Sequence, residues 1–351
     1  MTALGAIIAA QIAATGPMTL ADYMAICLLH PDHGYYTTRD PLGAAGDFTT
    51  APEVSQMFGE LLGLALAQAW LDQGAPNRFT LAELGPGRGT LMADVLRATR
   101  QVPGFHTAAQ VMLVEASPTL RAVQEVRLKG YAIRHTTTID TLPDQPLFLL
   151  ANEFFDALPI RQFHFDGQDW RERLVGLRDG TLAFSLSDPI PESFADRAFA
   201  TPVQGRVVER CPAAQGHLDA IGRCIRHNGG AALIVDYGGW RSSGDTFQAM
   251  RAHTFVDPLA EPGLADLTAH VDFEALAESC GLSSAFAEQG AFLFRLGIDA
   301  RAAKLAQSLT GDALQSHLAA HRRLTHPAEM GSLFKVLGLF PSDAPPLPGF
   351  A

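Results

Sequence analysis

The chain has 351 residues, 47% of them hydrophobic and 18% charged, which suits one large domain with elaborations or two modest ones. Its net charge of −11 argues against DNA or RNA as the main partner, because nucleic-acid-binding proteins carry a basic face. It favours a cationic partner such as an arginine-bearing protein segment. The four cysteines are far apart and form no CxxC pair, so we expect neither a metal site nor a disulfide framework.

Residues 1–75 are predicted to form a helical cover followed by a lid loop. The first helix presents apolar side chains on one face and is too short to cross a bilayer. A polar, glycine-containing loop follows from Pro31 to Ala51, and Pro52 suits the start of a long helix. No later segment holds about 18 uninterrupted apolar residues, so we expect no membrane span.

Residues 76–165 form the first part of a predicted Rossmann-like core, in which short apolar strands alternate with helices. This βαβαβ rhythm predicts an α/β fold with a parallel, doubly wound sheet and right-handed crossovers. The predicted strands are Phe79–Leu84, Val111–Glu115, Tyr131–Arg134 and Leu147–Ala151.

The remaining chain divides into three parts. Residues 166–213 are polar and irregular, and we interpret them as a partly antiparallel insertion. The core resumes over residues 214–300, and residues 301–351 form a C-terminal helix and tail. The elements predicted there are helix Ala214–His227, strand Ala231–Val235, a last strand Phe292–Leu296, helix Arg301–Leu324 and an extended, proline-rich tail.

The strongest local signal is a glycine-rich turn between a predicted strand and a predicted helix, with Gly85, Gly87 and Gly89 at alternate positions. Glycines let the backbone bend sharply and approach a ligand, and the following helix offers free N–H groups. A dinucleotide site has Gly-x-Gly-x-x-Gly spacing and holds an anionic pyrophosphate. Here Thr90 occupies the third glycine position of that pattern, and Glu83 would repel a pyrophosphate. A carboxylate instead suits the ammonium and sulfonium of S-adenosyl-L-methionine (SAM), so the turn favours SAM over NAD as the cofactor.

A second carboxylate, Glu115, ends the next predicted strand, where it can accept hydrogen bonds from both ribose hydroxyls of a nucleoside. NAD and SAM sites share this feature, so it predicts nucleoside binding without choosing between them. In the loop after the third strand, Asp140 is a candidate contact to the adenine amino group, with a plain loop role as the alternative. The loop Gly46–Thr50 and Glu60 are candidates for covering the donor.

An acidic loop follows the buried strand Leu147–Ala151. Its residues Asn152, Glu153 and Asp156 are expected near the donor methyl, because ligands of open α/β sheets bind at the carboxyl ends of the strands. A carboxylate can orient an arginine guanidinium bidentately and draw its charge away from the attacking nitrogen. Glu153 is the first candidate for this role and Asp156 the second. In the alternative, Asp156 caps a following helix and Glu153 binds only the amino group of the donor.

Further candidates lie later in the chain. Asp236 and Tyr237 end another predicted strand and are expected to line the same crevice. His270 lies in an aspartate-containing stretch and is a candidate proton acceptor or substrate contact, with a structural role as the alternative.

Several of these stretches together resemble the MidA-type methyltransferases, the family that includes a mitochondrial arginine methyltransferase for complex I assembly. The loop before Glu60 and the acidic loop are specific to the family, whereas the glycine turn alone is not. The matching segments are His33–Tyr36, Gly46–Glu60, Glu83–Thr90, Asn152–Pro159, Val235–Gly238 and Asp266–Phe273, all within Leu20–Gly297.

The resemblance implies a class I methyltransferase fold with a seven-stranded sheet and an N-terminal helical cover. It also implies a protein substrate, with symmetric dimethylation of an arginine in a respiratory complex I core subunit. By position, the donor-binding residues that it implies are Gly85, Gly87, Glu115 and, in the loop that closes the site, Asp47, Thr49 and Thr50.

Three functions are open at this point. The first is a protein-arginine methyltransferase, and the alternatives are a small-molecule SAM-dependent methyltransferase and a non-catalytic assembly factor that keeps the fold. The chain lacks an Arg-rich transit segment, which favours a cytoplasmic bacterial protein over a mitochondrial one. The sequence leaves open whether the chain forms a homodimer.

Overall fold

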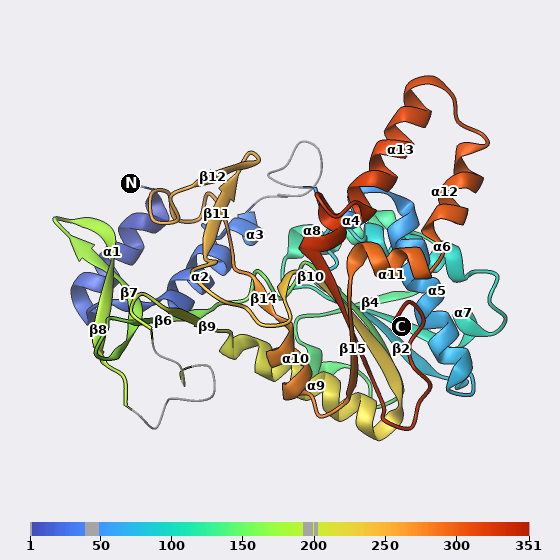
Figure 1. Ribbon diagram of the computed structural model, residues 1–351, viewed down its shortest axis with the longest axis horizontal. Helices are drawn as coiled ribbons and strands as arrows, with labels where there is room; N and C mark the ends of the chain where they lie inside the picture. The colour runs from blue at the N-terminus through green and yellow to red at the C-terminus, as the bar shows by residue number, and fades with distance from the viewer. Residues whose placement is uncertain (1, 39–48, 192–198, 200–202, 351) are drawn as a thin grey trace.

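The computed structural model describes residues 2–38, 49–191, 199 and 203–350, and its centre is a mixed β-sheet between helices (Figure 1). Among these residues, seven strands follow one another in the order β15-β16-β10-β5-β2-β3-β4, and the short β14 pairs with β10. All neighbours are parallel except that β16 runs antiparallel to both β10 and β15. The strands are β2 (Phe79–Leu84), β3 (Ala109–Val114), β4 (Ile133–Thr136), β5 (Leu147–Asn152), β10 (Gly230–Gly239), β14 (Val271–Asp272), β15 (Ser283–Glu288) and β16 (Phe334–Phe340).

Each face of this sheet carries its own layer of helices, because alternate side chains of a strand point to opposite faces. On one face, Leu81 and Leu150 join a core with α5, α6 and α11, and on the other, Leu149 and Ile234 pack with α9 and α10. The helices are α4 (Ala51–Val54), α5 (Gln56–Asp72), α6 (Thr90–Thr99), α7 (Phe105–Ala108), α8 (Pro118–Arg127), α9 (Pro212–Asn228), α10 (Phe273–Ser279), α11 (Gln289–Arg295), α12 (Ile298–Ala306), α13 (Gly311–Thr325), α14 (Met330–Leu333) and the 3-10 turn Ile139–Thr141.

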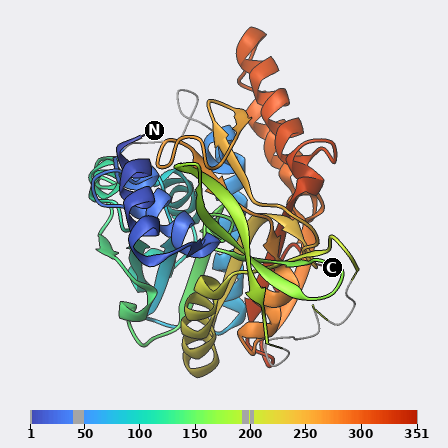
Figure 2. The same cartoon turned by 90° about the vertical axis from the view of Figure 1, so that its left-hand side faces the viewer.

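A second lobe combines segments that are distant in the chain (Figure 2). Strand β1 of the N-terminal segment pairs antiparallel with β7, so this segment extends a sheet of the insertion, and α1 and α2 share a hydrophobic core with both the insertion and the β11-β13 sheet. The elements are α1 (Ala3–Thr15), β1 (Met18–Thr19), α2 (Leu20–Leu29), α3 (Tyr35–Thr38), β6 (Arg161–Phe165), β7 (Trp170–Arg178), β8 (Thr181–Pro189), β9 (Val207–Arg210), β11 (Gln248–Arg251), β12 (Thr254–Val256) and β13 (Asp266–Thr268).

The structure corrects two predicted elements near the C-terminus. Phe292–Leu296 is not a strand, since most of it belongs to α11: Phe292 and Leu293 are both buried whereas Phe294 is 47% exposed, which is a helical pattern. The antiparallel strand of the sheet is β16, in a segment for which no element was expected. The predicted helix Arg301–Leu324 is two helices, α12 and α13, with α13 beginning after its N-cap Thr310.

Every helix in the described part of the chain is too short or too polar to span a lipid bilayer.

Candidate functional site

A cavity of about 770 Å³ lies at the carboxyl ends of β2, β3, β5 and β10, where the main sheet meets the second lobe. Open α/β sheets bind their ligands at this edge. Among the described residues that line it, six carry carboxylates and two are arginines, so its wall is acidic. The carboxylates belong to Glu53, Glu83, Glu115, Glu153, Asp156 and Asp266, and the arginines are Arg88 and Arg323.

The glycine turn forms one wall of this cavity. Gly85 and Gly87 line it with φ angles of +58° and +51°, a conformation that glycine adopts without strain. A Cβ atom on Gly85 would lie 2.8 Å from Cδ2 of Phe154, so the turn has no room for a side chain. Gly89 is the N-cap of α6 and contacts Gln124 of α8 instead of lining the cavity. The first two glycines therefore open the wall and the third packs two helices together.

Two buried carboxyl groups flank the turn. Glu115 Oε1 accepts a hydrogen bond from the Ser117 N–H at 2.8 Å, and its Oε2 accepts one from Gln124 Nε2 at 3.2 Å. Burial raises the pKa of Glu115, and it raises that of Glu83 to about 8. Oε2 of Glu83 is buried without a hydrogen-bond partner. An orphaned carboxylate oxygen beside a bare glycine turn fits the ammonium group of SAM, with Glu115 placed for the ribose.

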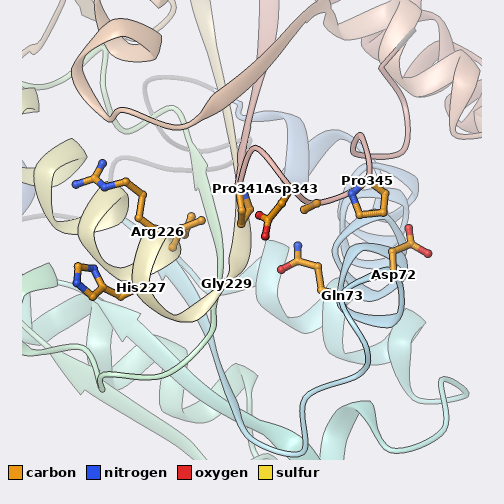
Figure 3. Close-up of a pocket in the computed structure, with 10 residues that line it drawn as sticks. Asp72, Gln73, Arg226, His227, Gly229, Pro341, Asp343 and Pro345 are labelled. Atoms are coloured by element: carbon orange, nitrogen blue, oxygen red, sulfur yellow. The ribbon is translucent and has the colours of Figure 1, made fainter.

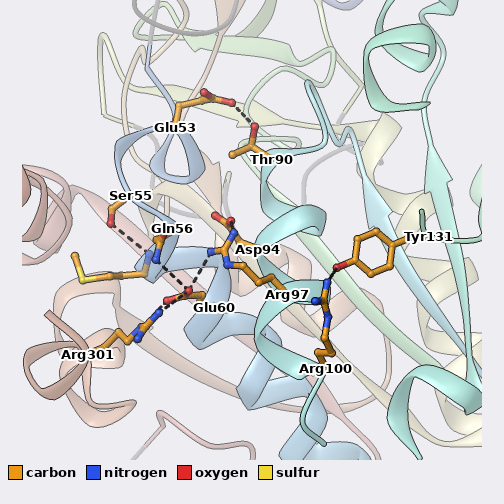
Figure 4. A network of polar contacts seen from close by, with 11 residues as sticks. Glu53, Ser55, Gln56, Glu60, Thr90, Asp94, Arg97, Arg100, Tyr131 and Arg301 are labelled. Carbon is orange, nitrogen blue, oxygen red and sulfur yellow. Dashed lines mark hydrogen bonds and ion pairs between the residues drawn. The ribbon is translucent and has the colours of Figure 1, made fainter. Parts of the chain in front are cut away.

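The structure also locates the residues expected to cover the donor. Thr49 and Thr50 line the cavity, whereas Asp47 lies outside the described residues. Next to them, Glu53 Oε1 accepts a hydrogen bond from the Thr90 hydroxyl at 2.5 Å, which ties α4 to the start of α6 (Figure 4).

Glu60 does not cover the donor, and this expectation was wrong. Its carboxylate is buried between Arg97 at 3.0 Å and Arg301 at 2.7 Å, away from the cavity lining (Figure 4). Burial alone would raise its pKa, but the hydrogen bonds from Arg301 and Arg97 lower it. Glu60 therefore joins α5, α6 and α12 and has a structural role.

Asp140 does not reach the cavity either. Its side chain is 66% exposed and forms an ion pair with Arg223 of α9 at 3.3 Å, which favours the loop role over the adenine contact. Thr137, in the same loop, lines the cavity instead. The sequence indicated the right loop, but only the turn geometry decides which side chain faces inward.

The acidic loop after β5 lies at the centre of the cavity. Glu153 has a positive φ of +51°, which is strained for a residue with a Cβ atom, and its Oε1 accepts hydrogen bonds from the Ala51 N–H at 3.2 Å and from Asn152 Nδ2 at 3.1 Å. Burial raises the pKa of Glu153 to about 8 and that of Asp156 to about 6. Oδ1 of Asp156 and Oδ1 of Asn152 are buried without hydrogen-bond partners.

Asp156 does not cap a helix, because the next element in the chain is strand β6. Its own N–H instead donates to Asp236 Oδ2 at 3.2 Å, and the Phe155 N–H donates to the same oxygen at 3.0 Å. Asp236 is fully buried behind the cavity wall, and burial raises its pKa. Asp236 therefore holds the acidic loop in place, whereas its neighbour Tyr237 lines the cavity as expected.

Three further polar side chains are among the residues that line the cavity on the side of the second lobe. His270 lines the cavity with its ring 5.4 Å from that of Tyr237, and burial and the nearby charge of Lys335 lower its pKa. Tyr36 and Asp266 also line it, and the Tyr36 hydroxyl donates to Asp266 Oδ1 at 2.8 Å. Sequence reasoning did not select Tyr36 or Asp266 as site residues, although both lie in segments that carried the family resemblance.

A smaller hollow of about 360 Å³ lies at the opposite edge of the sheet, between α5, α9 and the tail (Figure 3). Its Gln73 side chain is bonded to the backbone of Gly230 in both directions, at 2.7 and 3.0 Å. No residue that the sequence selected lines this hollow in the described part of the chain, so we place the site at the larger cavity.

Comparisons with known proteins agree with this geometry. The sequence model of a family described as "Putative S-adenosyl-L-methionine-dependent methyltransferase" matches residues 61–290. The chain is 39% identical to the protein arginine methyltransferase NDUFAF7, mitochondrial, of Danio rerio, over 93% of this chain and 84% of that protein. It is 36% identical to the Homo sapiens protein of the same name, over 94% and 82%.

A solved structure is similar over nearly the whole chain. A crystal structure from Burkholderia thailandensis with bound S-adenosyl-homocysteine covers 99% of this chain and 94% of its own, with a TM-score of 0.86 and 29% sequence identity. S-adenosyl-homocysteine is what SAM becomes after losing its methyl group, so this likeness agrees with the orphaned Glu83 and the open glycine turn.

Proposed function

We propose that this chain, which belongs to the MidA-type family of S-adenosyl-L-methionine-dependent methyltransferases, methylates the guanidinium of a protein arginine. Its fold is that of a class I methyltransferase and its methyl donor is SAM. The observation that carries the choice of acceptor is the acidic wall of the cavity, where Glu153, Asp156 and Asp266 are enclosed together. Buried carboxylates are costly unless a cation pairs with them, and arginine is the cationic side chain that never loses its charge.

The donor supplies a methyl group on a positively charged sulfur. We propose that Glu83 binds its ammonium, that Glu115 binds its ribose, and that Gly85 and Gly87 let the backbone approach it. Thr49 and Thr50 would close this side of the cavity, and the chemistry of each group suits a cationic nucleoside without phosphates.

The acceptor arginine would enter from the other side. Glu153 and Asp156 would bind the guanidinium through its N–H groups, which orients one nitrogen toward the methyl and holds positive charge on the rest. Asn152 positions Glu153 through its hydrogen bond to Oε1. As the new N–C bond forms and the S–C bond breaks, the nitrogen loses one proton. His270, whose pKa is lowered by burial and by the nearby charge of Lys335, would accept that proton.

The proposed target protein and methylation product rest on the family resemblance. We propose symmetric dimethylation of an arginine in a core subunit of respiratory complex I, and the named relatives are themselves protein arginine methyltransferases. Those relatives are named as mitochondrial proteins, which does not support the expected cytoplasmic location. A small-molecule acceptor and a non-catalytic assembly role remain the competing functions.

The test is transfer of label from isotopically labelled SAM to purified complex I core subunits, with mass spectrometry of modified arginines. For Glu153→Gln we expect a fall in kcat of about 100-fold with unchanged SAM affinity, because the variant removes one preorganised charge that acts on the reacting group. Glu125→Gln, exposed on α8, is the matched control and should behave like the wild type.

Two outcomes would contradict the proposal. Label found on a metabolite but on no protein would favour a small-molecule enzyme. A Glu153→Gln protein that binds SAM, transfers no methyl group and still supports complex I assembly in cells would favour the non-catalytic role.

A further inference from the structure

A tyrosine–carboxylate pair from the second lobe lines the cavity, and the mechanism proposed above gives neither side chain a specific role. Tyr36 lies on α3 and Asp266 begins β13, and both line the cavity. The Tyr36 hydroxyl donates to Asp266 Oδ1 at 2.8 Å, and Asp266 is 6% exposed. The two residues are 230 positions apart in the chain, so this pair exists only because the second lobe folds onto itself.

A similar pair comes from the main sheet. Tyr237 of β10 and Asp156 also line the cavity, and Oδ1 of Asp156 is buried without a hydrogen-bond partner. The cavity therefore holds a tyrosine and an aspartate from each lobe. A tyrosine hydroxyl that donates to one oxygen fixes the rotation of a carboxylate, and an ionised carboxylate can accept several hydrogen bonds at once.

The two pairs lie close together because the lobes are joined at this point. The Ala269 N–H, just after β13, donates to the carbonyl oxygen of Asp156 at 3.0 Å. The negative charge of Asp266 contributes to the raised pKa of Glu153, and that of Asp156 contributes to the raised pKa of Tyr36. The carboxylates of the two lobes thus enclose one space.

We propose that Asp266, oriented by Tyr36, is a second binding group for the acceptor guanidinium, which both lobes hold between them. This inference rests on the proposed function and adds the half of the site that selects the substrate. A guanidinium is planar and carries five N–H donors, so carboxylates from two sides can bind different edges of it. An ammonium lacks this planar fork, and a neutral urea group lacks the charge, so both bind less tightly.

The test measures binding directly, so it does not depend on turnover. Acetyl-arginine-amide is titrated by calorimetry into the full chain saturated with S-adenosyl-homocysteine, with the lysine and citrulline amides as comparison ligands. We expect the arginine compound to bind more tightly than both others. Asp266→Asn should weaken its binding about tenfold or more, because the carboxamide keeps an oxygen for the Tyr36 hydroxyl and loses only the charge.

Two further variants separate binding from structure. Tyr36→Phe should weaken binding less than Asp266→Asn, since it frees the carboxylate to rotate and keeps its charge. Glu261→Gln, on the surface of the same lobe where Glu261 pairs with Arg251, should change nothing. Once a subunit that the wild type methylates has been identified, Asp266→Asn should raise KM for that subunit and leave the affinity for SAM unchanged.

The inference is overturned if the wild type binds the arginine and citrulline amides equally, or if folded Asp266→Asn binds the arginine amide as the wild type does. Failure of the proposed function gives a different result, because the wild type would then bind the arginine amide but label no protein arginine.

Discussion

At the scale of single residues, the carboxyl group of Glu83 is the clearest sign of a cationic ligand. It is buried, burial raises its pKa to about 8, and one of its oxygens has no hydrogen-bond partner. The sequence selected it because a carboxylate preceding a glycine turn disfavours a pyrophosphate. Its protonation could not be read from the sequence, because it depends on how completely the surrounding strands and helix exclude water.

Donor binding should therefore depend on pH through Glu83. Below about pH 8 the empty protein holds this carboxyl protonated, and a bound cation favours the ionised form, so SAM binding should release a proton and strengthen as the pH rises from 6 to 8. Calorimetry in two buffers of different ionisation enthalpy measures that proton. In Glu83→Gln the proton release attributable to this group should vanish and the affinity should fall. An identical pH dependence in this variant would rule out Glu83 as the source.

Glu83 should also make the stability of the empty protein depend on pH, but in the opposite direction from donor binding. The raised pKa of Glu83 means that the folded state binds more protons than the unfolded state between the ordinary glutamate pKa and about 8. This contribution to the free energy of unfolding is therefore present at low pH and is lost as the pH rises through that window.

At the scale of elements, the turn between β2 and α6 needs glycine at position 85 for two reasons. Its φ angle is positive, and a side chain from another loop packs closely against it. The strand–turn–helix context of this turn is local in sequence and was predicted, and the strands on either side of it were predicted with it. What the sequence did not indicate is that Phe154, from the acidic loop, lies where a Gly85 side chain would be. The glycine turn and the acidic loop are therefore packed against each other.

Gly85→Ala should weaken SAM binding by at least about tenfold, because the new Cβ atom displaces Phe154 and strains a positive φ. Gly74→Ala is the matched control, since Gly74 also has a positive φ, +84°, but its Cβ would meet nothing within 4 Å. Both variants should lose roughly 1–2 kcal/mol of stability from the strained backbone. Equal SAM affinities for the two, measured by calorimetry alongside thermal unfolding, would show that the crowding at Gly85 does not matter for binding.

At the scale of the whole molecule, the second lobe is assembled from the N-terminal segment, the insertion and the β11-β13 sheet, which share one hydrophobic core. The sequence predicted an N-terminal cover and an insertion as separate parts. The side of the cavity that we propose for the acceptor depends on their joint packing, because α3 contributes Tyr36 and β13 contributes Asp266.

Two neighbouring isoleucines on α1 test this shared core. Ile8 is fully buried and Ile7 is 41% exposed, so Ile8→Ala should cost about 2–4 kcal/mol and Ile7→Ala less than about 1 kcal/mol. Urea unfolding measures both costs. In Ile8→Ala, hydrogen exchange should show reduced protection of the backbone amides of α2, β7 and the β11-β13 sheet. Reduced protection confined to α1 would contradict a shared core.

Features that depend on short stretches of chain could be predicted before the structure was known. The alternation of apolar strands and helices, the bend at Gly85–Gly89, the carboxylate Glu115 and the acidic loop from Asn152 are local patterns, and each of them lies at the cavity or beside it. Local patterns carry this information because strands, turns and helices are set by neighbouring residues.

Contacts between segments that are distant in the chain could not be predicted in this way, because they depend on how the whole chain packs. The tertiary structure made Phe292–Leu296 a helix and Phe334–Phe340 the antiparallel strand, because a short apolar run takes either form until its packing partners are present. It turned Asp140 outward to Arg223 and buried Glu60 between two arginines. It also brought Tyr36 to Asp266 across 230 positions, a contact set by the meeting of the lobes and by no spacing within the chain.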